Sequence, residues 1–204
     1  MEKDITLLLI GAGISLVSSF LTLYINRLLD RIGKLRIFYK IVCLPGGEEG
    51  GFYVDNDADM PTFTVPISFE FQNTSNSPRI IRNLNIYLYN DNVFVSKMVQ
   101  AEQVINTKTS RNNPPIIKEY NFGADHGMYS FLVSPHSISA YNCLFTLSIP
   151  YSKINEYTFN HLRLTYNNEK DHKKELFLFN FNGNWKDALL PYEFDWSSPK
   201  YWRE

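Results

Sequence analysis

The hydrophobic pattern of this 204-residue chain changes character near residue 33, from one unbroken apolar run to short alternating segments. Residues 5–25 read ITLLLIGAGISLVSSFLTLYI and contain no charged side chain. A helix rises about 1.5 Å per residue, so this run reaches roughly 30 Å, the thickness of a bilayer core. A helix also satisfies its own backbone hydrogen bonds in lipid. The pattern predicts a membrane-spanning helix over about 5–25 that continues to a C-cap at Gly33.

Two other interpretations of the apolar run stay open at this level. A buried core helix can also contain such an apolar run, although an uncharged run of this length is rare in soluble domains of this size. A cleaved signal peptide is the second alternative. Against cleavage, Glu2 and Asp4 offset the single Lys3, the run is longer than a typical signal core, and no A-x-A site follows it.

From Leu35 onward the hydrophobic period is two, which is typical of half-buried strands. The segment TFTVPISFEFQ, for example, places Val65, Ile67, Phe69 and Phe71 on one face. Similar alternation occurs in IIRNLNIYLYN, CLFTLSI, HLRLTY and KELFLFNF, and polar turn clusters separate these runs. The predicted fold is therefore mainly β: an N-terminal transmembrane helix with its basic flank (1–33), followed by an antiparallel Ig-like β-sandwich of seven or eight strands (34–204).

Two segments of the soluble part are ambiguous. Residues 100–127 have weak periodicity and are interpreted as a long insertion, the usual place for binding function, or as a disordered excursion. Residues 129–149 lack Asp, Glu, Lys and Arg, so a hydropathy window favours a second span. Pro135, His136 and the clean alternation after Cys143 favour two strands joined by a turn instead.

Small and polar side chains are concentrated on one side of the predicted span. At about 100° per residue they fall within a stripe roughly 100° wide. Small residues let helices approach closely, and their hydroxyls can hydrogen-bond across the contact. The stripe predicts self-association into a homo-oligomer within the membrane, or is simply the small-residue content common in spans. Its members are Gly11, Ser15, Ser18, Ser19, Thr22 and Asn26.

A basic collar follows the span and sets its expected orientation. One lysine precedes the apolar run, whereas its carboxyl side carries Arg27, Arg31, Lys34, Arg36 and Lys40, opposed only by Asp30. Positively charged flanks stay in the cytoplasm. We therefore expect a single-pass protein of the inner membrane, with the N-terminus outside, the sandwich in the cytoplasm, and the collar against lipid headgroups.

The remaining composition gives few signals of chemistry. The net charge of −1 favours no direct nucleic-acid binding, and the two cysteines form neither a disulfide framework nor a zinc site. The four histidines stand singly, and no catalytic motif is present, so we expect no enzyme, cofactor or metal. Asp55, Asp57 and Asp59 alternate as in a calcium loop, but Met60 and Pro66 occupy positions where that loop needs glycine and glutamate.

The C-terminal segment NWKDALLPYEFDWSSPKYWRE is dense in aromatic residues. Large aromatic surfaces mark contact sites when they are exposed. We expect this tail to pack over the sandwich or the collar, or to dock a protein partner. The candidate docking residues are Trp196, Tyr201 and Trp202.

The N-terminal span, the small β domain and the Asn-rich composition together resemble the short transmembrane effectors of bacterial anti-phage defence systems, including the retron type. The resemblance is architectural and rests on no motif, so no family residue is transferred. Some such effectors have two spans, whereas this chain shows one. The resemblance implies a membrane-perturbing effector that acts by abortive infection, with a defence-complex subunit as the protein partner of its cytoplasmic domain. The alternative is a membrane-tethered binding or scaffold module whose helix is a plain anchor.

Overall fold

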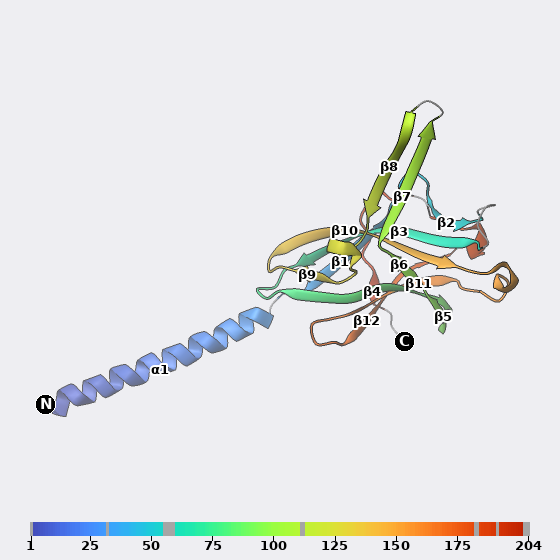
Figure 1. The fold of residues 1–204 in the computed structure, drawn as a ribbon. Coiled ribbons are helices and arrows are strands. Elements are labelled where there is room, and N and C mark those ends of the chain that lie inside the picture. The colour runs from blue at the N-terminus through green and yellow to red at the C-terminus, as the bar shows by residue number, and fades with distance from the viewer. Residues whose placement is uncertain are drawn as a thin grey trace.

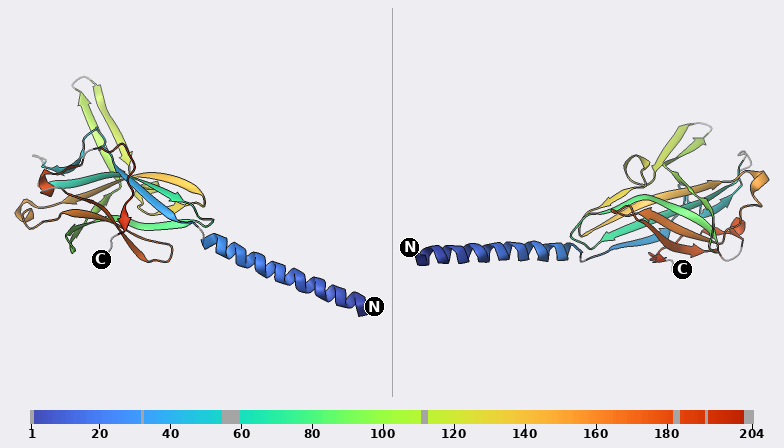
Figure 2. Two further views of the ribbon diagram at one scale, coloured as in Figure 1. Left: turned by 180° about the vertical axis from the view of Figure 1, so that it is seen from behind. Right: turned by 90° about the horizontal axis from the view of Figure 1, so that it is seen from below.

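The computed structural model describes residues 2–31, 33–54, 60–110, 113–181, 184–190 and 192–201. It shows a single long helix, α1 (Glu2–Arg31), that projects from one end of a β-sandwich (Figure 1). The helix runs roughly along the long axis of the sandwich, so the molecule is elongated (Figure 2). The mainly β class, the N-terminal apolar helix and the antiparallel sheets are confirmed, and the arrangement is compatible with the finer Ig-like assignment without establishing it.

The first sheet is organised around β3, the strand that the sequence marks most clearly. Strand β3 (Thr62–Asn73) pairs along its whole length with β10 (Ser137–Ser148). On its other side it pairs with β1 (Leu35–Ile41) near its end and with β2 (Gly50–Tyr53) near its start. Two short strands, β6 (Val99–Ala101) and β13 (Leu189–Leu190), complete the edges.

The second sheet has β4 (Arg79–Asn90) and β11 (His161–Asn167) at its centre. Strand β12 (Lys173–Asn180) and the short β14 (Lys200–Tyr201) extend it on one side. On the other side β4 pairs with β5 (Val93–Lys97) and with β9 (Phe131–Val133). Every pairing described in both sheets is antiparallel, which suits strands joined by short turns.

The core between the sheets follows the predicted alternation. Val65, Ile67, Phe69 and Phe71 are fully buried, as the pattern of β3 requires. Strands β4, β10 and β11 likewise bury Leu84, Ile86, Leu88, Phe145, Leu147, Leu162 and Leu164. Burying a side chain of this size contributes roughly 1.5–3 kcal/mol, so this interior dominates the stability of the domain.

The structure has more strands than the seven or eight expected from the alternation, with fourteen in the part of the chain it describes. The additional ones are mostly two to five residues long, too short to show a period. Residues 129–149 form β9, a turn and β10, so the second-span interpretation is wrong; polar and apolar side chains alternate there as in any half-buried strand.

The segment near 100–127 is an ordered hairpin, which excludes a disordered excursion for the residues described. Strand β7 (Gln103–Ser110) pairs only with β8 (Asn113–Asn121), and the two project from the sandwich (Figure 1). A short 3₁₀ turn, η1 (Asp125–Gly127), follows the hairpin. Val104 and Tyr120 pack partly against the core at its base.

The C-terminal tail closes the open side of the sandwich, beginning at a 3₁₀ turn, η3 (Trp185–Asp187). Trp185 is buried and stacks on Phe159, so the first part of the tail belongs to the core. Further on, Ser197 exchanges two backbone hydrogen bonds of 2.8 Å with Tyr39 of β1. Strand β14 then pairs with β12 of the other sheet. Residues 193–201, here called the strap, therefore join the free edges of both sheets.

Candidate functional site: the helix and its junction with the sandwich

The helix stands clear of the sandwich over its apolar length. Residues Ile5–Leu28 are long and apolar enough to cross a membrane, and none of this segment is buried inside the protein. At the helical rise they reach about 36 Å, against roughly 30 Å for the hydrocarbon core. A soluble protein does not leave an apolar surface of this size uncovered, because it is costly to hydrate. The buried-core-helix interpretation is therefore wrong.

The polar stripe on the helix is compatible with lipid because some of its hydroxyls have partners inside the helix. The Ser19 hydroxyl donates to the Ser15 carbonyl at 2.9 Å, and the Thr22 hydroxyl donates to the Ser18 carbonyl at 2.8 Å. Such back-bonding satisfies a hydroxyl donor without water. A Cβ added at Gly11 would meet nothing within 4 Å, so this position of the stripe has no neighbour in the single chain.

The helix joins the sandwich through a very short connection. It ends at Arg31, and β1 begins at Leu35. Gly33 has a φ of +109°, and a Cβ there would lie 2.5 Å from both the Ser75 Cα and the Thr74 carbonyl oxygen. The Lys34 N–H donates to Thr74 Oγ1 at 2.9 Å, and the Thr74 N–H donates back to the Lys34 carbonyl at 3.1 Å. Gly33 and Lys34, which follow the helix, are thus fixed to the turn that follows β3.

That turn is itself held rigidly by a buried asparagine. Asn73 is 2% exposed, and its amide nitrogen donates to the carbonyls of Ser77, Val133 and Ser134 at 2.8–3.1 Å. Its Oδ1 accepts from the N–H and the hydroxyl of Ser75. Because these bonds tie the turns after β3 and β9 together, both sheets meet the helix as one unit.

The collar residues lie at this junction, and the fold adds others that are distant in sequence. Arg27 lies on the helix, the backbone of Arg31 ends it, and Lys34 and Arg36 are exposed beyond it. The strand ends and turn nearest the junction, 79–82 and 167–175, contribute five more cations against three carboxylates. The added cations are Arg79, Arg82, Lys170, Lys173 and Lys174. The sequence pattern does not reveal them, because only strand pairing brings β4 and the β11–β12 turn to this end.

Both added arginines are already paired with acidic groups. Arg79 lies 2.7 Å from Glu169, and Arg82 lies 3.2 Å from Asp171. Both pairs are partly or well exposed, so each contributes little to stability. They hold the β11–β12 turn against β4, while Lys170 and Lys174 stay exposed beside them.

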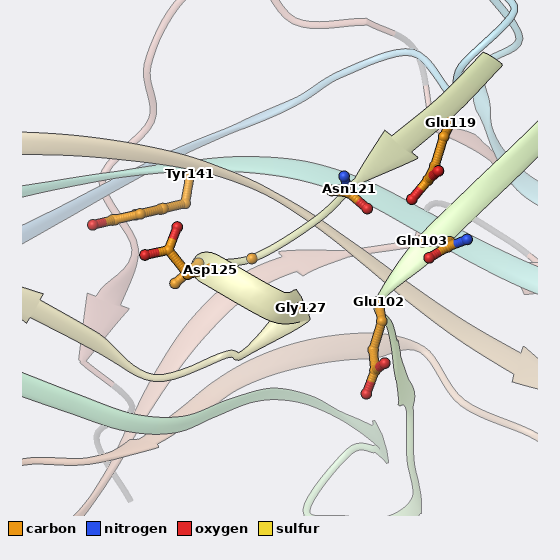
Figure 3. A pocket seen from close by; sticks show the side chains of 9 residues that line it. Glu102, Gln103, Glu119, Asn121, Asp125, Gly127 and Tyr141 are labelled. Carbon is orange, nitrogen blue, oxygen red and sulfur yellow. The ribbon is translucent and has the colours of Figure 1, made fainter.

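A separate pocket of about 710 Å³ lies at the base of the hairpin (Figure 3). Its wall contains Glu102, Glu119, Asp125, Asn121 and Tyr141, so it is polar and acidic. In the close-up, Asp125 lies beside Tyr141, whereas Glu119 and Asn121 extend from the opposite side. The described residues contain no group of three His, Cys, Asp or Glu that could hold a metal ion.

The remaining candidate residues are the aromatic residues of the C-terminal tail and the acidic run near residue 57. Trp196 is partly exposed on the strap, and its ring lies 4.9 Å from the Lys40 ammonium. The backbone of Tyr201 lies in β14, while Trp202 and the acidic run Asp55, Asp57 and Asp59 lie outside the described residues. Phe194, which was not singled out, is the most exposed large apolar side chain described, at 83%. The strap thus packs on the sandwich and still presents aromatic surface.

Comparisons with family models, curated proteins and solved structures found no match to this chain.

Proposed function

We propose that the chain is a single-span inner-membrane protein with an outside N-terminus and a cytoplasmic sandwich, and that it acts as a membrane-perturbing effector in bacterial anti-phage defence. In this proposal copies associate through the stripe of Gly11, Ser15 and Ser19. A signal sensed by the sandwich then changes how the spans pack, and the membrane becomes leaky. The proposal assigns no catalytic step to the chain.

The observation that carries the proposal is the rigid junction at Gly33. A plain anchor functions with a flexible linker, because it only has to hold a domain near the membrane. Here Lys34 and Gly33 are locked to the turn at Thr74 and Ser75, so a rotation of the sandwich is transmitted to the span. Such coupling supports a helix whose packing is controlled from the cytoplasmic side.

The stripe is tested by placing a bulky side chain on it in the full-length protein. We expect Gly11→Leu and Ser15→Leu to abolish depolarisation of cells that express the protein, because leucine prevents close helix approach. The measurement is uptake of a potential-sensitive dye, with membrane insertion checked by carbonate extraction. Gly13→Leu is the matched control, since Gly13 lies about 200° around the helix from Gly11 and also has free space.

The effector interpretation is contradicted if Gly11→Leu and Ser15→Leu depolarise cells as strongly as the wild type. Equal loss in the Gly13→Leu control would also contradict it, because the effect would not be specific to the stripe.

A second candidate function is a membrane-tethered binding module. The observation that favours it is the hairpin β7–β8, which extends from the sandwich and has an open polar pocket at its base. Projecting loops on a rigid scaffold are common binding sites. In this case a partner would be held at the inner face of the membrane, and a scrambled leucine-rich span would leave function intact.

A further inference from the structure

The junction contains a crevice between the two sheets, on the side that the strap closes. It has a volume of about 180 Å³ and opens between β1 and β12. Its lining includes Lys34, Arg36, Tyr166, Leu176 and Ser198. It therefore combines apolar side chains with two exposed cationic residues at its mouth, at the end of the sandwich where the helix enters.

The backbone of β1 is open inside this crevice. Tyr39 directs both its N–H and its carbonyl toward Ser197 of the strap. Residues two apart in an antiparallel strand direct these groups to the same side, so those of Leu35 and Ile37 also point away from β3. Among the described residues no backbone partner is found for them there. Amide N–H groups bind anionic oxygens, and free carbonyls accept from hydroxyls.

The positive charges at the mouth of the crevice favour binding of an anion. Lys34 and Arg36 are exposed, and within the part of the chain that the structure describes neither has an acidic partner. Arginine and lysine are the usual side-chain ligands of phosphate groups. The open edge of β1 extends only from Leu35 to Ile37, because Tyr39 already pairs with Ser197 of the strap. This edge is too short to pair with an added strand.

The position of the crevice identifies the source of such a group, on the condition that the helix spans the membrane as proposed above. Lys34 lies six residues beyond Leu28, the last residue of the apolar segment. The helix continues only to Arg31, about 4.5 Å beyond Leu28, and three further residues lead to Lys34, which places it at the outer limit of a headgroup layer about 5–8 Å thick. Long basic side chains extend back from such positions toward the headgroups.

From these observations we propose that the crevice between β1 and β12 binds the headgroup of an anionic phospholipid. The phosphate contacts Lys34, Arg36 and the backbone N–H groups of Leu35 and Ile37. Hydroxyls of the headgroup donate to the open carbonyls. Because the strap forms one wall through Ser198, an occupied crevice favours the closed strap beside the helix end.

The test uses the full chain purified in a non-ionic detergent, with phosphatidylglycerol and phosphatidylcholine as probes. Native mass spectrometry counts retained lipid, and thermal unfolding reports stabilisation. We expect wild-type protein to retain phosphatidylglycerol, and the Lys34→Gln/Arg36→Gln double variant to bind it at least tenfold more weakly. Lys97→Gln/Lys153→Gln is the control, because it removes the same charge elsewhere on the sandwich.

A second variant probes the crevice without removing a cation. Ser198 is exposed on the strap, so Ser198→Glu places a carboxylate in the crevice wall with little cost to folding. We expect it to weaken phosphatidylglycerol binding, whereas Ser152→Glu, on an exposed turn, leaves binding unchanged.

The proposal is overturned if the double variant or Ser198→Glu binds phosphatidylglycerol like the wild type, or if phosphatidylcholine binds equally well. Equal stabilisation by soluble glycerol 3-phosphate would also overturn it, because the site would then take a free phosphate ester. Loss of depolarisation in the stripe experiment is a separate readout, so failure of the crevice and failure of the effector function are distinguishable. If carbonate extracts the wild-type chain, the shared premise of a span fails.

Discussion

At the residue scale, the outer face of the second sheet carries an unexpected buried polar cluster. The sequence HLRLTY predicts inward Leu162 and Leu164, and the structure agrees, but His161 and Arg163 on the opposite face are also buried, at 3% and 5% exposure. Arg163 stacks on Tyr89, pairs with Glu175 at 3.0 Å and donates to the Asp91 carbonyl. Tyr89, Phe177 and the turn after β4 contact these two side chains, and an alternation pattern does not encode such contacts.

The hydrogen bonds of His161 require a neutral ring. Its Nε2 accepts from the Arg163 Nε–H at 3.0 Å, so its Nδ1 carries the proton and donates to Asn160 Oδ1 at 2.7 Å. Burial, and next the Arg163 charge, lower the pKa of His161 below its ordinary value of 6.5, against the opposing effect of Asp91 and Glu175. Protonation removes the acceptor and places two cations together.

Stability should therefore fall in mild acid. Since the folded pKa of His161 is below the unfolded one, the unfolded chain binds more protons between the two values. The free energy of unfolding is then highest above pH 6.5 and decreases as the pH falls below it. Urea unfolding of the full chain in detergent at pH 7.5 and 5.5 measures this. We expect His161→Asn to reduce the pH dependence of the free energy of unfolding, and His172→Asn, in an exposed turn, to leave that dependence unchanged. A wild-type chain equally stable at pH 7.5 and 5.5 would contradict this prediction.

At the element scale, the long strands could be predicted from the alternation of apolar and polar residues. The short strands and the polar hairpin could not. Strands β3, β4 and β10 each extend twelve residues, so their period is clear. The hairpin β7–β8 was missed as strands because it is polar and contains Pro114 and Pro115, residues that normally argue against a strand. They are tolerated because each strand of a two-stranded hairpin has a free edge. The pairing of the strap with Tyr39 depends on the tertiary fold alone.

The hairpin should be removable without loss of the fold. Its strands pair only with each other, and only its base packs on the core through Val104 and Tyr120. Replacing residues 105–119 with Asn-Gly should change the melting temperature of the full chain by no more than about 5 °C. Circular dichroism of the purified protein during heating measures this.

Phe122→Ala provides the comparison for the hairpin deletion, since Phe122 lies next to the hairpin but belongs to the core. Its truncation should cost about 3–5 kcal/mol. If the deletion destabilises the protein as much as Phe122→Ala does, the hairpin is part of the domain rather than an appendage to it.

At the scale of the whole molecule, the basic residues are concentrated at the end of the sandwich from which the helix projects. The end of the sandwich next to the helix contains Lys34, Arg36 and the basic residues of β4 and the β11–β12 turn. The pocket at the base of the hairpin, in contrast, is acidic. The helix extends the long axis of the sandwich beyond this basic end (Figure 2). In the proposed orientation, anionic headgroups would attract this collar and hold the sandwich end-on to the leaflet. The apolar helix and part of the collar could be predicted from the sequence; the contacts of Gly33 and Lys34 and the crevice could be seen only in the fold.

The orientation of the chain is the central claim, and cysteine accessibility in intact bacterial cells tests it most directly. In a Cys43→Ser background, with the buried Cys143 retained, a membrane-impermeant maleimide is applied to Lys3→Cys and Ser152→Cys variants. The account predicts that Lys3→Cys is labelled in intact cells and that Ser152→Cys is labelled only after lysis. Labelling of Ser152→Cys in intact cells, or a mature chain that begins near Phe20, would contradict it.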